Sequence, residues 1–448
     1  MTNTEHRSLT NEPVPILLRS IAVPASIGFF FNTMYNVVDS WVAGQISGEA
    51  LAALSVTFPV FFIIIALAIG IGTGVTALIA NELGAQKTEK AKLYATQTIS
   101  FGLITSIIIT IAGYLAAPTL FKFLGASDSY LTATLAYMQP IFLGSIFIAM
   151  VIILNGILNA VGNTKSYRNV LVAGFFLNVL LSPTLALGWF GLPTLGILGI
   201  AVATLISNLL GLIYISYKVW QTKLIDRECL SCYLKPNKKI YADIMSQGLP
   251  ASLNMMTVAI GAFIITYFVS QYGKEAVAGY GTAIRVEQMV LIPSMGINMA
   301  VLALIGQNNG AKRHDRITEI AAVGIRYILI LGTIGTTILF FAAAPLMKLF
   351  TEEPDIIGFG VGYLAVAAFI TWAYGIIFVT EAILRGLKKP IFPLILGVVR
   401  QTIVPLTAFY LVTFVFTLSI VGLWWSIFII VWSSALISLW YTRRQMSL

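Results

Sequence analysis

Long apolar segments recur along the whole chain and are separated by short polar stretches. A helix needs about 20 apolar residues to cross a hydrocarbon core of about 30 Å. We place twelve such segments at 16–43, 50–80, 93–117, 129–157, 168–190, 195–217, 241–271, 276–306, 317–345, 357–384, 391–415 and 419–441. No hydrophilic stretch between them is long enough to fold as a separate domain. The pattern predicts an all-α integral membrane protein with twelve transmembrane helices.

The composition agrees with this assignment. Of the 448 residues, 58% are hydrophobic and only 10% are charged, whereas a soluble domain carries about 25% charged residues. The first apolar segment is too long for the hydrophobic region of a signal peptide, and no small-residue cleavage site follows it. We therefore expect no cleavable signal.

The formal net charge is +9, and its distribution predicts the topology. With the spans above, 22 of the 27 Lys and Arg residues fall in the even-numbered loops, the two termini and the adjoining helix ends. Positive charge marks the cytoplasmic side. We expect a multi-pass protein of the bacterial inner membrane with both termini in the cytoplasm, and no nucleic-acid partner.

An internal repeat divides the chain at a fixed offset of 226 residues. Pro24 recurs as Pro250, and Gly70 recurs as Gly296. Each repeat contains six spans, an even number, so both halves enter the membrane in the same orientation as a parallel repeat. We expect two pseudo-symmetric six-helix bundles, at 1–217 and 241–448, joined by a cytoplasmic linker at 218–240.

The repeat does not extend to the ionisable positions. Asp39 corresponds to Ile265, and Glu287 corresponds to Phe61. One scaffold has thus been used twice, and we expect each half to have a different chemical role.

The first span carries the clearest group of polar residues. Asn32, Tyr35, Asn36 and Asp39 have the spacing i, i+3, i+4 and i+7, which places them on one face of a helix. An Asp at the centre of a membrane helix costs about 2.5–3.5 kcal/mol on the insertion scale. We interpret Asp39 as a carboxylate that exchanges protons or cations. The alternative is that it lies near the outer end of the span and meets water.

Other polar positions in the first half could support such a site. Pro24 kinks the first span, either as a conformational hinge or as a static bend. Asn178 and Ser182, and likewise Thr204 and Asn208, have i, i+4 spacing in spans five and six. These pairs could line a cavity with span one, or they could be ordinary helix contacts of small energy.

The charges of the second half are weaker candidates. Glu381 precedes Arg385 by four residues, the spacing of a simple helical ion pair. Arg285 and Glu287 are two residues apart and so do not share a helix face. We advance pairing of Glu287 with Arg400 across helices as a hypothesis.

Methionines of the second half, among them Met289, could line a plastic drug cavity or could be packing residues. Cys229 and Cys232 form a C-x-x-C in the cytoplasmic linker, where we expect them to be reduced. Two thiolates make only half of a usual zinc site, and we expect no metal or other cofactor.

Several motifs are absent from the sequence. It contains no G-x-x-x-x-G-K-[ST] phosphate loop. It contains neither H-E-x-x-H nor G-x-S-x-G. We therefore expect a protein that is not an enzyme, and one whose uphill transport would depend on an ion gradient.

At this point the chain resembles the multidrug and toxic compound extrusion (MATE) family, and within it the DinF-type bacterial branch. The resemblance covers nearly the whole chain and rests on short motifs and on the twelve-span, two-half plan. The motifs are the span-one proline followed by Tyr35-Asn36-x-x-Asp39, the glycine-rich stretch 70–74, the segment 81–85, and Leu384-Arg385-Gly386.

The resemblance implies export of amphipathic, often cationic, compounds in exchange for H⁺ or Na⁺. It implies that Asp39 is the coupling carboxylate, and that Asn178 and Thr204 are the family's span-five asparagine and span-six threonine. Relatives carry an aspartate four residues after that asparagine, where this chain has Ser182. One fewer anionic ligand weakens a hard-cation site, and span seven lacks the glutamate of Na⁺-coupled relatives. Protons are therefore the favoured coupling ion.

The sequence thus predicts a secondary active multidrug efflux antiporter, most simply a monomer, that rocks two bundles around a central cavity. Its partners would be drug-like molecules and the lipid bilayer. The alternatives are a Na⁺-coupled drug antiporter and a flippase for a lipid-linked oligosaccharide, for which only Arg285 and Arg400 offer basic residues inside the spans. An intramembrane enzyme or a non-transporting scaffold would require a catalytic dyad or make Asp39 unnecessary.

Overall fold

The computed structural model describes residues 8–123, 128–225 and 235–446, and these residues are helical with short connections. Eleven helices are long and apolar enough to cross a membrane, and a bent helix pair raises the number to as many as twelve. The predicted all-helical membrane fold is therefore confirmed. Cys229 and Cys232 lie outside the described residues.

Among the described residues, the first half of the chain has seven helices and one short 3-10 turn. They are α1 (Val14–Ile46), α2 (Gly48–Gly84), α3 (Thr88–Phe123), α4 (Asp128–Leu143), α5 (Ser145–Ala160), α6 (Lys165–Leu187), η1 (Trp189–Gly191) and α7 (Ile197–Gln221).

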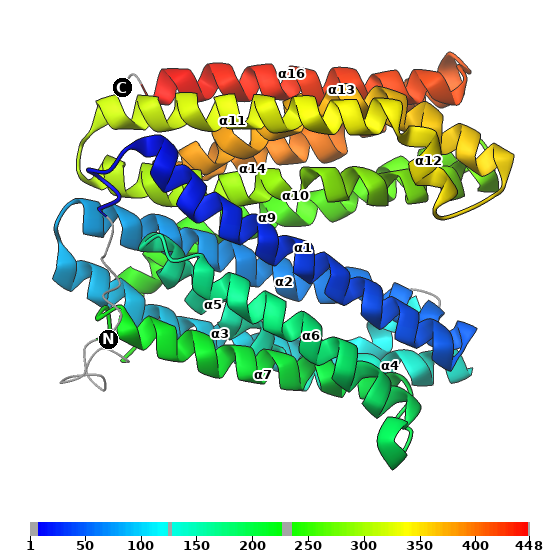
Figure 1. Ribbon diagram of the computed structural model, residues 1–448, viewed down its shortest axis with the longest axis horizontal. Helices are drawn as coiled ribbons and strands as arrows, with labels where there is room; N and C mark the ends of the chain where they lie inside the picture. Colours follow the sequence, from blue (N-terminus) through cyan, green and yellow to red (C-terminus); the bar gives the residue numbers. More distant parts are fainter. Residues whose placement is uncertain (1–7, 124–127, 226–234, 447–448) are drawn as a thin grey trace. The chain divides into compact units, whose positions relative to one another are not determined.

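The second half repeats this plan with differences near its end. Its elements are α9 (Lys238–Ser270), α10 (Lys274–Gly310), α11 (His314–Phe341), α12 (Ala343–Lys348), α13 (Pro354–Gly386), α14 (Ile391–Val398), η2 (Val399–Ile403), α15 (Val404–Tyr410), η3 (Leu411–Val415) and α16 (Ile420–Met446). In Figure 1, α11, α13 and α16 run along one another in this half.

The fourth predicted span is broken rather than continuous. Helices α4 and α5 meet at a bend of 49°. Pro140 lies within the last turn of α4, and Gly144 separates the two helices. Proline and glycine are common causes of sharp helix bends, and they account for the break in a segment that hydropathy alone predicts as one span.

The chain forms two compact units, and it crosses between them inside two helices. One unit contains residues 27–252, and the other contains residues 1–26 and 253–448. The crossings therefore fall after Ser26 in α1 and after Ser252 in α9, two residues beyond Pro24 and Pro250 respectively. The division predicted from sequence, at 217 and 240, stays a prediction about the two repeats.

The first part of α1, up to Ser26, belongs to the unit of residues 253–448, and the first part of α9, up to Ser252, belongs to the unit of residues 27–252. We call these two segments the exchanged helix ends, and equivalent contacts hold them in place. In one unit the Ser26 hydroxyl donates to the carbonyl oxygen of Pro293 at 3.3 Å. In the other, the Ser252 hydroxyl donates to the carbonyl oxygen of Leu67 at 3.2 Å. Ser26 and Ser252 are related by the 226-residue offset, and so are Leu67 and Pro293. The same contact is therefore made once in each unit.

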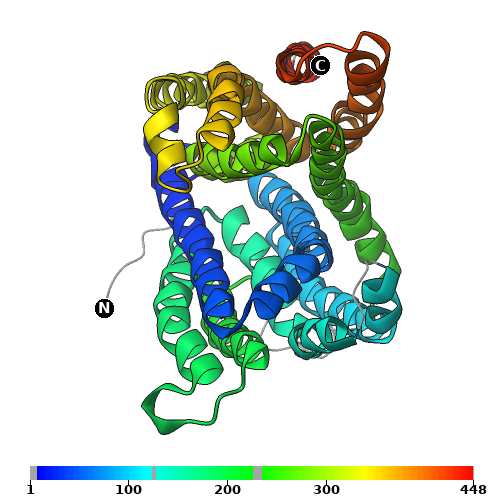
Figure 2. The ribbon, with the colours of Figure 1, turned by 90° about the vertical axis from the view of Figure 1, so that its right-hand side faces the viewer.

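Each unit has its own apolar core. In the unit of residues 27–252, α2, α3, α5 and α7 enclose buried Ile, Leu and Ala side chains. In the other unit, α10, α13 and α16 surround Trp424 and Phe409. Figure 2 views the helices closer to end-on and shows their bundled arrangement within each half. Many large apolar side chains point outward, such as Leu115 at 72% exposure, as expected where lipid replaces water.

Candidate functional site

Asp39 is buried in the unit of residues 27–252. Its side chain is 6% exposed. Its Oδ1 atom accepts hydrogen bonds from the Asn178 amide at 2.9 Å and from the Ser182 hydroxyl at 3.1 Å. The two donors lie one turn apart on α6, so a single helix face presents both of them to α1.

A glycine on α1 permits close packing against α6. A Cβ atom on Gly28 would lie 3.2 Å from the Cα atom of Arg168 and 3.1 Å from the Leu171 side chain. Such distances are tighter than ordinary van der Waals contact. The absence of a side chain at Gly28 thus helps α1 run near α6, where Asp39 meets its donors.

A second polar contact lies one turn before Asp39. The Tyr35 hydroxyl donates to the Thr204 hydroxyl on α7 at 3.1 Å. Ser207, one turn farther along α7, has a buried hydroxyl with no hydrogen-bond partner among the described residues. Tyr137 on α4 is also buried and lies within electrostatic range of Asp39.

The four polar residues that the sequence places on one face of α1 lie in two different environments. Tyr35 and Asp39 point into the unit, whereas Asn32 and Asn36 are exposed. The Asn36 amide donates to the Asn32 carbonyl oxygen at 3.0 Å, and the Asn208 amide donates to the Thr204 carbonyl oxygen at 2.9 Å. The structure therefore brings four predicted residues around Asp39 and leaves three amide side chains outside this cluster.

The cluster has the groups needed to bind one small cation or one proton. Within the described residues, Oδ2 of Asp39 receives no hydrogen bond and the carboxylate has no ion-pair partner, while Oδ1 of Asn178 is buried without a donor. Three or more His, Cys, Asp or Glu side chains do not gather anywhere in that part of the chain. The site thus offers one carboxylate with neutral oxygen neighbours.

The hypothesised pairing of Glu287 with Arg400 is wrong. Glu287 is 4% exposed and accepts a 2.7 Å hydrogen bond from the Tyr363 hydroxyl. Arg400 lies in the π-helical turn η2, with its guanidinium 5.8 Å from the centroid of the Tyr374 ring. Tyrosines of α13 occupy the positions next to both charged groups, so the two do not form an ion pair.

The remaining predicted residues of the second half lie in varied surroundings. The ion pair of Glu381 with Arg385 is confirmed, at 2.8 Å, and the Asn254 amide also donates to Glu381 at 3.1 Å. Arg285 is exposed within its span, as is Met289 at 39%.

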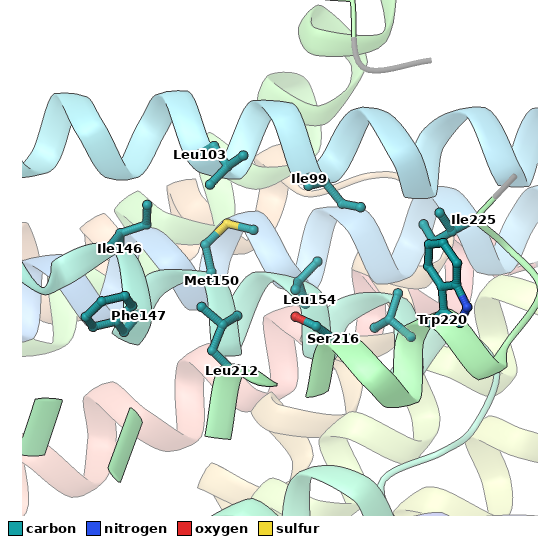
Figure 3. A pocket seen from close by; sticks show the side chains of 11 residues that line it. Ile99, Leu103, Ile146, Phe147, Met150, Leu154, Leu212, Ser216, Trp220 and Ile225 are labelled. Atoms are coloured by element: carbon teal, nitrogen blue, oxygen red, sulfur yellow. The ribbon is translucent and has the colours of Figure 1, made fainter. Parts of the chain in front are cut away.

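An apolar pocket lies elsewhere in the unit of residues 27–252. It has a volume of about 300 Å³ and is lined by side chains of α3, α5 and α7, among them Leu103, Met150 and Trp220 (Figure 3). None of the predicted site residues lines it, and its walls offer almost no polar group. The polar cluster around Asp39 is therefore the better candidate for the site.

Comparison with known proteins agrees with these features. An all-helical chain with two repeated bundles and a buried carboxylate inside the membrane has the architecture of a secondary transporter. A family model described as MatE matches residues 24–184 and 250–408, and the two matches begin at Pro24 and Pro250. The chain therefore belongs to the MatE family, whose members are membrane transporters rather than enzymes.

Relatives and solved structures of this kind cover nearly the whole chain. A probable multidrug resistance protein of Bacillus subtilis, YoeA, is 26% identical over 93% of this chain and 89% of its own length. An FAD transporter of Shewanella oneidensis is 26% identical over 90% of this chain and 89% of its own length. A MOP superfamily transporter from Pyrococcus furiosus has a solved structure that is 25% identical, with a TM-score of 0.92, and covers 100% of this chain and 99% of its own.

Proposed function

We propose that this chain is a multidrug efflux antiporter that expels amphipathic or cationic organic compounds in exchange for protons, with Asp39 as the coupling carboxylate. The observation that carries the proposal is the buried carboxylate of Asp39, with donors on Oδ1 and none on Oδ2 among the described residues. The name of the Bacillus subtilis relative supports drug-like substrates.

Protonation of Asp39 would change both its charge and its hydrogen bonding. The ionised group accepts from Asn178 and Ser182 through one oxygen and can take a proton on the other. In the proposed cycle a proton from outside neutralises Asp39 and α1 shifts, so that the drug leaves outward. Deprotonation to the cytoplasm then resets the protein by rocking of the two bundles around a central cavity.

Protons are favoured over sodium because of the donor set. Na⁺ is a hard cation, and sites for hard cations in proteins gain affinity from charged oxygen ligands. Asp39 supplies a single negative charge, and Ser182 stands where relatives are expected to carry a second carboxylate. A neutral hydroxyl stabilises a bound cation less than a carboxylate does.

The proposal also covers the branch of the family, the membrane, the topology, the oligomeric state and the hinge. We place the chain in the DinF-type branch, in the bacterial plasma membrane, with both termini in the cytoplasm and as a monomer. Pro24 is the proposed hinge of α1. These proposals rest on the sequence motifs and on the distribution of Lys and Arg among the loops.

Dye export from drug-sensitive cells and from everted vesicles tests the main proposal. Wild type should move ethidium-like dyes when a proton gradient is imposed, and Asp39→Asn should reduce transport to background. The matched control is Glu49→Gln, which removes an exposed carboxylate of the same unit and should transport normally. Transport that needs a sodium gradient alone would refute proton coupling, and normal transport by Asp39→Asn would refute the role of Asp39.

One observation favours a second candidate substrate class. Arg285 is exposed within its span, where a charge is tolerated only if it faces water or a ligand, and the Shewanella oneidensis relative is an FAD transporter. The chain could therefore export an anionic aromatic compound such as a flavin dinucleotide. FAD should then compete with dye export, and Arg285→Gln should weaken that competition. Dye export that is insensitive to FAD would exclude this candidate.

A further inference from the structure

A second carboxylate is buried in the unit formed mainly by the C-terminal half. Oε2 of Glu287 accepts the hydrogen bond from Tyr363, whereas Oε1 is buried and has no hydrogen-bond partner among the described residues. A buried ionised oxygen without a donor is costly. Oε1 is therefore the atom of this cluster at which a ligand would bind.

The walls of this site are closely packed aromatic rings. Tyr280 lies two helical turns before Glu287 on α10, and its ring stacks on Trp424 with centroids 5.6 Å apart. Tyr363 meets both rings edge to face at 5.0 Å. Tyr363 also donates to Glu287, so these packed rings lie beside the carboxylate. The ligands that need the least space at Oε1 are a proton and a very small cation.

A fixed positive charge decides between these two ligands. Arg400 is 6% exposed, and its Nε and Nη1 atoms have no hydrogen-bond partner in the described part of the chain. Arginine stays protonated in proteins, and Tyr374 lies within electrostatic range of both Arg400 and Glu287. A nearby permanent cation disfavours a second metal-like cation, whereas a proton forms a covalent O–H bond and neutralises the carboxylate.

Three tyrosines lie within electrostatic range of Glu287. They are Tyr280 on α10 itself and Tyr363 and Tyr374 on α13, and Arg400 in η2 lies over the ring of Tyr374. Glu287 is the only carboxylic acid among these groups.

The repeat links this site to the one around Asp39. Tyr363 corresponds to Tyr137 at the 226-residue offset, and Tyr137 lies within electrostatic range of Asp39. Ile265, which corresponds to Asp39, packs against the core that contains Tyr363. Each half therefore has a buried tyrosine at the same repeat position beside its own carboxylate, although the carboxylates come from different helices.

We propose that Glu287 is a second proton-binding carboxylate, with Oε1 as the protonated atom and Tyr363 as the residue that positions it. The proton comes from water on one side of the membrane, forms the O–H bond, and returns to water on the other side. With Glu287 ionised, its charge balances that of Arg400. With Glu287 protonated, the positive charge of Arg400 is uncompensated and disfavours a cationic substrate in this half.

Infrared difference spectroscopy of the purified full-length protein between acidic and alkaline pH tests proton binding without any drug. Wild type should show a buried carboxylic acid C=O band that Glu287→Gln removes and Asp39→Asn retains. Glu275→Gln, which replaces a partly exposed glutamate in the first turn of α10, should also retain it. Should Glu287→Gln fold poorly, Tyr363→Phe should keep the band and shift its frequency, because it removes only the 2.7 Å hydrogen bond.

A spectrum that Glu287→Gln leaves unchanged would overturn the proposal, as would a band unaffected by Tyr363→Phe.

The coupling of Glu287 to transport is measured separately in proteoliposomes, and this part rests on the proposed function. Glu287→Gln should reduce the number of protons exchanged per substrate by one without abolishing export, and an unchanged number would refute a coupling role. A failure of Asp39→Asn to block export would refute the proposed function and leave the infrared result on Glu287 unaffected.

Discussion

At the scale of single residues, Ser182 determines how many carboxylates the Asp39 site can offer to a cation. Its hydroxyl lies 3.1 Å from Oδ1 of Asp39, so Ser182→Asp would place a second carboxylate beside the first. We expect sodium to stimulate dye export by this variant about tenfold, which corresponds to about 1.4 kcal/mol of added cation binding. Ser182→Asn has a similar size without the charge and should stay insensitive to sodium. Equal responses of the two variants would exclude this role of charge.

The contact of Tyr35 with Thr204 supports a second prediction at this scale. Tyr35→Phe removes one hydrogen bond of 3.1 Å, and a typical hydrogen bond contributes about 1 kcal/mol net. We expect the initial rate of dye export to fall about fivefold, while Asp39 still binds and releases protons. Tyr217→Phe changes an exposed tyrosine of the same helix α7 and serves as control. A rate as low as that of Asp39→Asn would show that Tyr35 has a larger role than positioning.

Sequence reasoning could select some of these residues and had to miss others. Asp39, Asn178 and Ser182 stand out because polar side chains are rare and costly in apolar spans. Ser207 and Tyr137 give no such signal, because serine and tyrosine are common in helix packing and at membrane interfaces. Their positions beside the site depend on how helices pack, which spacing within one helix does not encode.

At the scale of elements, two glycines allow the exchanged helix ends to dock. A Cβ atom on Gly70 would lie 2.3 Å from the backbone nitrogen of Ser252, and one on Gly296 would lie 2.4 Å from the carbonyl oxygen of Ala22. Displacing backbone atoms costs more free energy than rotating a side chain. Gly70→Ala and Gly296→Ala should therefore each destabilise the protein by about 1–3 kcal/mol. Thermal unfolding in detergent should show a lower midpoint for both variants.

The control for these substitutions is another helical glycine. A Cβ atom on Gly174 would meet nothing within 4 Å, so Gly174→Ala should be neutral or slightly stabilising through helix propensity. If all three variants unfolded alike, close packing at Gly70 and Gly296 would not be the cause. The repeat suggested that Gly70 and Gly296 correspond, but hydropathy could not show that each contacts a serine far away in the sequence.

At the scale of the whole molecule, the topology predicted from positive charge can be tested by labelling. Lys274 and Lys312 are both exposed, and the predicted topology places them on opposite sides of the membrane. In a background with Cys229 and Cys232 replaced by serine, Lys274→Cys should react in intact cells with an impermeant maleimide. Lys312→Cys should react only after permeabilisation. The reverse pattern would place both termini outside the cytoplasm.

The exchange of helix ends is the feature of the whole molecule that the sequence could not reveal. Apolar periodicity identifies which face of α1 or α9 is buried, but not which half of the chain covers it. The repeat and the basic linker therefore predicted a boundary between span six and span seven. The compact units of the structure are joined within α1 and α9, and the boundary at 217 and 240 stays a prediction about the two repeats.

We expect any relative movement of the two units to bend α1 and α9 where the chain passes from one unit to the other, close to Pro24 and Pro250. Proline removes a backbone hydrogen bond and makes a helix easier to bend. Pro24→Ala and Pro250→Ala should therefore stiffen α1 and α9 where they pass from one unit to the other. We expect each variant to slow dye export severalfold while equilibrium dye binding stays unchanged, because the site residues are untouched. Pro118→Ala alters α3, which lies wholly within one unit, and should not slow export. Equal slowing by Pro118→Ala, or weaker dye binding by the crossing variants, would mean that these prolines shape the fold rather than permit its movement.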